Sequence, residues 1–258
     1  MQRLSSVEVV PGVVVMTIAR PEKLNAMDEQ FFAELTDVMR RTGVDDGVRA
    51  VVLTGQGRAF SAGGDIGTFA AMDGDVHRVR PHLRRVFDAF CALERCAAPV
   101  IAAVNGIAFG GGTELALACD VVLAGQSARF AFKEPTMGLM PGYGIVRGPE
   151  VMGRHWTRYL ALSGRELTAD RAERAGLVQE VHSDDELLAA AVQLASEIAA
   201  HSPLATQVGK AFVNRDAVGG FNESIEATAL LFGTAEHRAA VTAFRAGPES
   251  AARAGQER

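Results

Sequence analysis

The sequence is poor in cysteine, has no excess of basic residues and contains no apolar run of membrane-spanning length. Its three cysteines, Cys91, Cys96 and Cys119, form neither a CxxC pair nor a metal-ligand spacing, which argues against a disulfide framework and indicates a reducing compartment. The formal net charge of −5 argues against nucleic acid as the main partner. The first residues lack the basic segment and apolar core of a secretory signal. We therefore expect a soluble cytoplasmic protein that spans no membrane.

What the sequence does contain is typical of a globular protein, with 48% apolar and 22% charged residues in 258 positions. Alternating residues near the N-terminus predict a hairpin around Pro11 and Gly12. The apolar runs RAVVLTG, PVIAAVNG and DVVLAG are separated by helical patterns, which predicts an α/β fold with a mainly parallel sheet. Later segments are mostly helical. We predict an α/β core over residues 1–195 and a helical C-terminal region, used for oligomerisation, over residues 196–258.

Two helix starts are predicted from single residues. Asp28 is placed to cap a helix with Phe31 and Phe32 on its apolar face, because an aspartate side chain accepts hydrogen bonds from the first free N–H groups of a helix. Pro81 is expected at the start of another helix, where the missing N–H of proline is not needed. The residues from Gly67 to about Arg80 form a polar segment of mixed composition before it.

Residues 106–113, GIAFGGGT, come close to a phosphate-binding P-loop, but Gly112 occupies the position of its lysine. Without the lysine, and without an evident Walker B strand, the nucleotide interpretation is weak. Glycines before a helix leave N–H groups open to a phosphate or an oxyanion. Taken alone, this motif is equally typical of a tight packing turn, and Glu114 in the following helix is typical of a residue that stabilises the helix dipole.

A second glycine-rich turn, AFSAGGDI at residues 59–66, follows another buried strand. If the two strands are neighbours in a parallel sheet, both turns emerge at the same edge, where such sheets bind ligands. Two backbone N–H groups could then meet at one oxygen. Glu134 lies further on, in the loop FKEPTMGLMPG, where a solvated glutamate would also be unremarkable.

Together and in this order, AFSAGGDI, NGIAFGGGTELALACDVVLA and FKEPTMGLMPGYG resemble the crotonase, or enoyl-CoA hydratase/isomerase, superfamily. The segments ARPEKLNAM, ALSGRELTADRAERAGLVQEV and LFGTAEHRAAVTAF are also similar to family segments, so that the resemblance covers roughly residues 5 to 246. The resemblance implies a crotonase-like core of ββα repeats with a helical C-terminal region.

The resemblance also implies the roles of individual residues. The N–H groups of Ala62 and Gly111 would form an oxyanion hole for a thioester carbonyl, and Glu114 and Glu134 would be the catalytic acid and base. The implied contacts to substrate and coenzyme A are Lys23, Leu24, Ala62, Gly63, Gly64, Asp65, Ile66 and Gly111. The implied substrate is an acyl-CoA, with coenzyme A as part of the substrate and with no further cofactor or metal. The implied assembly is a homotrimer or a hexamer made of two trimers.

Departures from the family pattern leave the reaction open. Lys133 stands before Glu134 where the hydratases usually have proline, and Tyr143, Ile145 and Val146 interrupt a usual glycine-rich run. Lys133 would either alter the ionisation of Glu134 or point to solvent. Both glutamates favour an enoyl-CoA hydratase, because the isomerases of the family usually lack the first. An isomerase, hydrolase, decarboxylase or lyase on this fold, or a non-catalytic acyl-CoA-binding protein, stays open.

The predicted oligomer has a physical reason as well. Two C-terminal helical segments have long apolar faces, and one α/β core does not obviously cover both. The first face contains Leu187, Leu188, Ala191, Val192, Leu194, Ala195 and Ile198, and the second contains Leu230, Leu231, Phe232, Val241 and Phe244.

Overall fold

The computed structural model describes residues 2–42, 47–72 and 75–214. The chain divides into two compact units, the first ending at Ala200 and the second beginning at His201. Within the described part of the second unit lies helix α9 (Pro203–Val213). The boundary expected after residue 195 falls inside helix α8 (Leu187–Ala199), so the first unit extends a few residues beyond the prediction.

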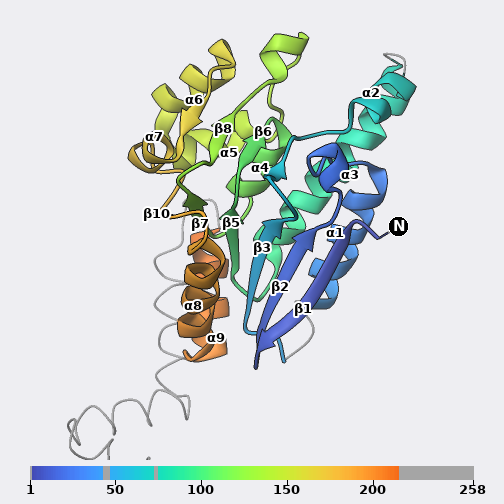
Figure 1. The fold of residues 1–258 in the computed structure, drawn as a ribbon. Coiled ribbons are helices and arrows are strands. Elements are labelled where there is room, and N and C mark those ends of the chain that lie inside the picture. The colour runs from blue at the N-terminus through green and yellow to red at the C-terminus, as the bar shows by residue number, and fades with distance from the viewer. Residues whose placement is uncertain (1, 43–46, 73–74, 215–258) are drawn as a thin grey trace, which may run out of the picture. The chain divides into compact units, whose positions relative to one another are not determined.

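The first unit is built around a large sheet, which within the described residues has the strand order β1-β2-β3-β5-β7-β10 (Figure 1). Its strands are β1 (Leu4–Val10), β2 (Val13–Ile18), β3 (Ala50–Gly55), β5 (Val100–Val104), β7 (Val121–Gly125) and β10 (Glu180–His182). β1 and β2 form the predicted antiparallel hairpin. All other neighbours pair in parallel, which confirms the prediction of a mainly parallel sheet.

A smaller sheet has the order β4-β6-β8-β9 among the described residues. It consists of β4 (Ala59–Ser61), β6 (Ile107–Phe109), β8 (Arg129–Ala131) and β9 (Leu167–Thr168). Each of β3, β5 and β7 in the large sheet is followed along the chain by one strand of the small sheet and then by a helical segment. This repetition is the ββα core that the resemblance implied. It places β4, β6 and β8 side by side and parallel.

Helical segments connect the strands, and some of them, such as α8, cover the large sheet (Figure 1). They are η1 (Pro21–Lys23), α1 (Glu29–Thr42), α2 (Ile66–Met72), α3 (Val76–Arg95), α4 (Gly111–Leu117), η2 (Glu134–Met137), α5 (Gly144–Val151), α6 (Gly153–Ser163), α7 (Ala169–Arg174) and α8. α1 packs against α3, while α8 packs against β2, β3 and β5.

One of the two predicted helix starts is confirmed and the other is wrong. Asp28 Oδ1 accepts a hydrogen bond from the Phe31 N–H over 3.0 Å, as expected of a cap. The second helix, α3, begins at Val76 instead of Pro81, because the Asp75 carboxylate accepts the N–H of His77 and caps it earlier. Pro81 therefore lies within α3. The polar segment before Pro81 contains most of α2 and the first turn of α3.

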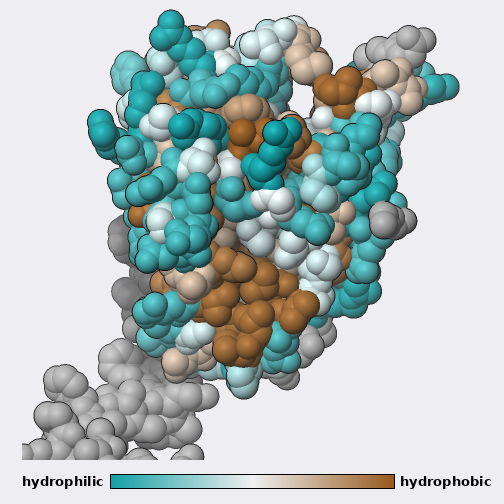
Figure 2. Space-filling model, viewed as in Figure 1, coloured by the Kyte–Doolittle hydropathy of each residue, from teal (hydrophilic) through white to brown (hydrophobic). Residues whose placement is uncertain are grey.

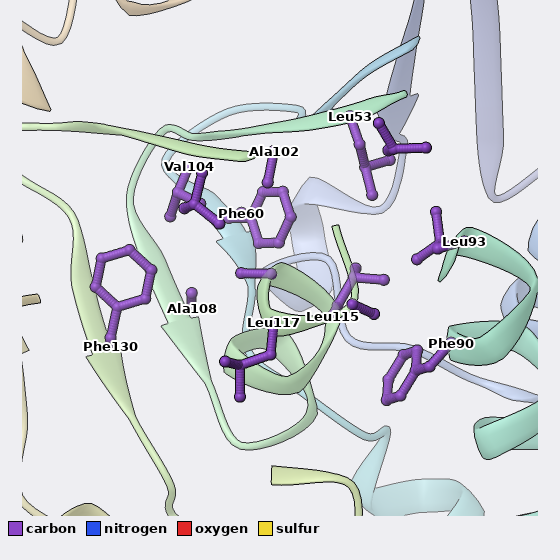
Figure 3. Close-up of a cluster of buried hydrophobic side chains, with 14 of the residues drawn as sticks. Leu53, Phe60, Phe90, Leu93, Ala102, Val104, Ala108, Leu115, Leu117 and Phe130 are labelled. Carbon is purple, nitrogen blue, oxygen red and sulfur yellow. The ribbon is translucent and has the colours of Figure 1, made fainter. Parts of the chain in front are cut away.

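Helix α4 passes through the interior, and all its residues from Gly112 to Leu117 are buried. Figure 3 shows Leu115 and Leu117 of α4 between apolar side chains of both sheets and of α3. Phe60, Ala102 and Phe130 are among them, and none is exposed. Burying a large apolar side chain contributes about 1.5–3 kcal/mol, so this surrounding core fixes α4 firmly in place.

The apolar face of α8 is used by the first unit itself. Leu187, Ala191 and Ala195 are buried, and they belong to one cluster with residues of β2, β3, β5 and β7 such as Val52 and Leu123. The core thus covers only part of the predicted apolar face, because Leu188 is 45% exposed. The second apolar face expected from the sequence, residues 230–244, lies outside the described residues.

Candidate active site

Three segments meet at the carboxyl edge of the small sheet, because β4, β6 and β8 are parallel neighbours. These segments are the AGGD turn after β4, Gly110 and Gly111 after β6, and Glu134 shortly after β8. The two glycine turns contact each other directly. A Cβ atom on Gly63 would lie 2.6 Å from the Phe109 carbonyl oxygen, and a Cβ atom on Gly112 would lie 2.3 Å from the Ser61 carbonyl oxygen. The turns approach this closely because those side chains are absent.

The structure corrects one member of the expected pair of N–H donors. The Ala62 N–H donates to the Leu24 carbonyl over 2.9 Å, so it is already used. The N–H groups of Asp65 and Gly63 are bonded as well, to Met27 O and Ser61 Oγ.

Among the described residues, the N–H groups of Gly64 and Gly111 donate to no acceptor in the chain. A Cβ atom on Gly111 would lie 3.7 Å from the Gly64 nitrogen, so the two groups are close neighbours. The geometry thus assigns the second donor to Gly64 in place of Ala62. Gly63 lies between Ala62 and Gly64, and its φ of +95° turns the backbone there. The spacing of residues in the sequence did not reveal this turn.

The EKLNA segment, residues 22–26, holds the AGGD turn, residues 62–65, in place through hydrogen bonds. Asn25 is fully buried, and its Nδ2 donates to the carbonyl oxygens of Gln56 and Ala59 over 3.0 and 2.7 Å. Its own carbonyl accepts the hydroxyl of Ser61 over 2.8 Å. Leu24 and Asn25 adopt φ values of 49° and 57°, which are costly for residues other than glycine. The many hydrogen bonds to Asn25 hold this strained loop in place.

A chain of ion pairs fixes the end of the same turn. Arg20 bonds both Asp65 (2.6 Å) and Asp28 (3.2 Å), and Asp28 also bonds Arg3 (2.7 Å). Burial alone would raise the pKa of Asp65, but the Gly67 N–H and Arg20 outweigh it and hold the pKa below its usual value. Asp65 is therefore an anchor for the turn, which is a structural role beyond the contact to coenzyme A that the sequence implied.

The expected contacts to coenzyme A lie in two places. Lys23 and Asp65 line a cavity of about 620 Å³, together with Asp28, Glu29, Gly67, Thr68, Ala71, Met72, Arg78 and Arg85. Ile66, which follows Asp65 in the chain, is 55% exposed. Gly63 and Gly64 belong to the glycine turn, and Leu24 holds that turn through its carbonyl. The cationic side chains in the cavity, including Arg78 and Arg85, were not found from the sequence because no motif marks them.

Glu114 is a buried carboxylate, only 6% exposed, in the first turn of α4. Its Oε1 accepts the N–H groups of Tyr143 (2.9 Å) and Gly144 (2.8 Å) at the start of α5. Burial raises the pKa of Glu114, the Gly144 N–H lowers it, the nearby charge of Glu134 raises it and the Tyr143 N–H lowers it, with a result of about 7. Glu114 can thus gain or lose a proton near neutral pH.

Glu134 differs from Glu114 in its hydrogen bonding. Its Oε2 atom is buried, and it is the one buried side-chain polar atom of the described residues that lacks a hydrogen-bond partner. Burial raises the pKa of Glu134, and its own backbone N–H lowers it in part. A Cβ atom on Gly110 would lie 2.8 Å from Glu134 Oε1, and Gly110 itself has φ 51°. The carboxyl therefore reaches the glycine turn through the space that a side chain would fill.

Lys133 does not pair with Glu134. Its Nζ lies 2.8 Å from Glu166 Oε1 and 4.8 Å from the centre of the Phe109 ring. The Lys133 charge is thus matched by another carboxylate, and of the two alternatives left open, alteration of Glu134 is not supported. Tyr143 is buried, which the interrupted glycine run did not reveal.

The arrangement combines two free N–H donors with two carboxyls of different hydrogen bonding. Such donors stabilise negative charge on an oxygen, and a pair of carboxyls with separated environments can divide acid and base roles. Within residues 2–42, 47–72 and 75–214, no three His, Cys, Asp or Glu side chains gather as metal ligands. In the same ranges no helix has the length and hydropathy of a membrane span.

Comparisons with known proteins agree with this arrangement. The chain matches the family model for enoyl-CoA hydratase/isomerase over residues 8–250. It is 36% identical over 242 residues to the 2,3-dehydroadipyl-CoA hydratase of Escherichia coli strain K12, which covers 90% of this chain and 91% of that protein. It is 38% identical over 210 residues to the mitochondrial Delta(3,5)-Delta(2,4)-dienoyl-CoA isomerase of Homo sapiens, with coverage of 77% and 64%.

The structural comparison leads to the same family. The solved structure of an enoyl-CoA hydratase from Bacillus anthracis has a TM-score of 0.90 and 31% identity, covering 95% of this chain and 96% of that one. The chain belongs to the enoyl-CoA hydratase/isomerase family and has its crotonase fold. It is accordingly an enzyme of enoyl-CoA thioesters, either a hydratase or an isomerase.

The raised pKa of Glu114 predicts a dependence of stability on pH. The folded state holds the Glu114 proton up to about pH 7, whereas the usual pKa is 4.5. Between these values the unfolded chain ionises first, so the contribution of Glu114 to stability falls as pH rises and is lost above pH 7. At about 1.4 kcal/mol per unit the full loss is about 3 kcal/mol. Glutamine does not ionise, so the Glu114→Gln variant does not undergo this loss of stability.

We therefore expect urea unfolding to show Glu114→Gln gaining about 3 kcal/mol relative to the parent protein between pH 4 and pH 8. The matched control is Glu173→Gln, at an exposed glutamate of α7, whose difference from the parent should stay constant. Parallel stability curves for Glu114→Gln and the parent would mean that Glu114 does not titrate near neutral pH.

Proposed function

We propose that the protein is an enoyl-CoA hydratase that adds water across the double bond of a 2-enoyl-CoA. The observation that carries the proposal is the unequal pair of buried glutamates beside two free N–H groups. Glu114 has two backbone donors on one oxygen, and Glu134 has an oxygen with none. Hydration needs one carboxylate to take a proton and one carboxylic acid to give one.

The proposed reaction begins with the thioester oxygen bound by the N–H groups of Gly64 and Gly111. A water oxygen bonds to C3, the electrons of the double bond move towards the carbonyl, and negative charge develops on the thioester oxygen. The two donors stabilise this enolate, and each such donor is typically worth about 3 kcal/mol of barrier. The enolate then takes a proton at C2. The addition of water causes no net oxidation or reduction of the substrate, so the reaction requires no redox cofactor.

The hydrogen bonding of the two carboxyls supports a division of roles. Donors on Glu114 favour its ionised form, which makes Glu114 the base that takes the proton of water. Burial without a donor on Oε2 favours the protonated form of Glu134, which makes it the acid that gives a proton to C2. After each turnover the two groups return to their starting states by proton exchange.

Double-bond isomerisation is the second candidate, because a relative of 38% identity is named a dienoyl-CoA isomerase. Isomerisation moves a proton between carbons of the acyl chain and needs no water. The two reactions change the conjugated thioester absorbance in opposite directions. Hydration of crotonyl-CoA lowers the absorbance, because it removes the conjugated double bond. Isomerisation of a 3-enoyl-CoA to its 2-enoyl isomer raises the absorbance, because it creates one. Turnover of the 3-enoyl-CoA alone would favour the isomerase, and binding of both without turnover would favour a non-catalytic protein.

The first activity prediction concerns the two carboxyls. Glu114→Gln and Glu134→Gln should each lower kcat for crotonyl-CoA by about 10²–10⁴-fold, because a general acid or base contributes about that much. Binding of the substrate should stay nearly unchanged in calorimetry. A parent-like kcat in either variant would remove that glutamate from the mechanism, and loss confined to Glu134→Gln would favour the isomerase. Glu173→Gln serves again as the control, with unchanged kcat.

The second activity prediction concerns the Gly111 N–H. Gly110 caps α4, so Gly111 is the first helical residue, a position that accepts proline. Gly111→Pro should lower kcat about 10²–10³-fold, because it removes one donor to the enolate. Gly111→Ala adds the same Cβ atom beside the flexible Met27 but keeps the N–H, and should retain most of the activity. Equal losses in the two variants, with normal circular dichroism, would mean that the effect is steric.

We also propose a trimer or a hexamer, as the family resemblance implies. The support from the structure is an apolar surface over the strands of the large sheet, in the lower part of Figure 2. β1 at the edge of this sheet exposes Val7, Val9 and Val10 by 62%, 44% and 37%. Exposed apolar patches of this kind mark contact surfaces.

The oligomer is tested by light scattering at micromolar concentration. We expect three or six times the chain mass of 27.3 kDa. Val7→Lys, on the exposed face of β1, should weaken the assembly, while Leu162→Lys, at a 79% exposed leucine in α6, tests whether any added charge has the same effect. A parent mass near 27 kDa would exclude the assembly.

A further inference from the structure

A group of three polar side chains lies between α3 and α5 and takes no direct part in the proposed reaction. Glu94, near the end of α3, is bound by the guanidinium of Arg147, with distances of 2.7 Å from Nε to Oε1 and 2.9 Å from Nη2 to Oε2. The hydroxyl of Tyr143 donates to the same Glu94 carboxylate. The side chains of Glu94 and Arg147 are only 16% and 27% exposed. A two-bond pair of this kind is stronger and more directional than a single contact.

Tyr143 connects this group to Glu114. Its backbone N–H donates to Glu114 Oε1, and the N–H of the next residue, Gly144, donates to the same atom. The Arg147 N–H donates to the Tyr143 carbonyl over 3.0 Å, which closes one turn of backbone between the two side chains bound to Glu94. Glu94 therefore binds the side chains at both ends of the first turn of α5. The N–H groups of Tyr143 and Gly144, at the start of the same turn, bind Glu114.

The packing of Tyr143 favours the same interpretation. Its ring lies edge to face against Phe90, with centroids 5.2 Å apart, and tilted against Phe87 at 6.4 Å. Burial and then the hydrogen bond to Glu94 raise the pKa of the Tyr143 hydroxyl, so the hydroxyl stays protonated and keeps donating. The ring alone could slide in its apolar surroundings, whereas the hydroxyl bond fixes its position along α3.

We propose that Glu94 is a positioning residue for Glu114, which acts through Tyr143 and Arg147 by holding the first turn of α5 where its N–H groups meet the Glu114 carboxylate. The kinetic part of this inference rests on the proposed role of Glu114 as the base. The structural part does not, because the two N–H groups stabilise the ionised carboxylate whatever reaction follows. Loosening the turn lengthens both bonds and makes ionisation of Glu114 less favourable.

The main test is Tyr143→Phe, which removes one hydroxyl and leaves the ring and the backbone N–H. The other tyrosine of the chain offers a matched control, Tyr159→Phe, because the Tyr159 hydroxyl bonds Arg171 and Arg165 and its ring packs on Trp156 in α6. In Tyr143→Phe we expect kcat at neutral pH to fall about three- to tenfold, as loss of one hydrogen bond would give. The acidic limb of the kcat profile should move to higher pH by about half to one unit. KM should change little, and Tyr159→Phe should match the parent.

A second pair of variants tests Glu94 itself. Glu94→Gln weakens both the Arg147 pair and the Tyr143 bond, and should shift the acidic limb at least as far as Tyr143→Phe does. Its control is Glu150→Gln, at the exposed outer partner of Arg147, which leaves the inner pair intact and should not shift the limb. Arg147→Lys keeps the charge but loses the two-bond geometry, so it should behave like Glu94→Gln.

Direct titration of Glu114 separates this inference from the proposed function. In protein labelled with ¹³C at the glutamate carboxyl, the signal missing from Glu114→Gln identifies Glu114 in the NMR spectrum. Its titration should move to higher pH in Tyr143→Phe and Glu94→Gln, and this readout stands even if the parent protein does not hydrate crotonyl-CoA. If either folded variant titrates like the parent, or loses only stability against urea, Glu94 holds the fold alone and the inference is overturned.

Discussion

A carboxylate inside an apolar core has to be solvated by the protein itself, and in this chain that requirement joins distant parts of the fold. Glu114 sits on a helix whose other residues pack against two sheets, so the carboxylate cannot move out to water. Its hydrogen bonds come from the start of α5, about thirty residues further along the chain. The position of α5, and with it Tyr143, Arg147 and their contact to α3, follows from the need to supply those two N–H groups.

The small sheet provides the second constraint. Because β4, β6 and β8 are parallel neighbours, the segments that follow them are delivered to one edge, and each contributes a different kind of group. Two of the segments approach within contact distance because Gly63 and Gly112 have no side chains. The strained loop at Leu24 and Asn25 and the ion pairs of Arg20 then brace the AGGD turn from outside. The geometry of the candidate site is thus a consequence of sheet order and of close backbone packing.

Much of this was predictable from the sequence, and what was missed has physical causes. Apolar runs predicted the strands, the two glycine turns predicted a shared edge of the sheet, and the family resemblance implied that Gly111, Glu114 and Glu134 would form one site. The resemblance assigned Ala62 as a donor, and the sequence could not show that Gly64 is free instead, because that depends on the turn at Gly63. Pro81 was taken for a helix start since its own residue type favours one, but the Asp75 cap acts first. The apolar face of α8 gave no indication that the sheet would cover it.

The donors that face Glu114 and the proposed enolate site all belong to the main chain: Gly64, Gly111, Tyr143 and Gly144. A mutation that changes a codon replaces a side chain, and only a change to proline deletes an N–H group. The anion-stabilising half of such a site therefore needs the glycines that let the turns approach but no particular functional side chain, while the carboxyls can be exchanged one at a time. Exchange of the carboxyls alone would then change the reaction without rebuilding the scaffold, in keeping with relatives at 36% and 38% identity that have the names of a hydratase and an isomerase.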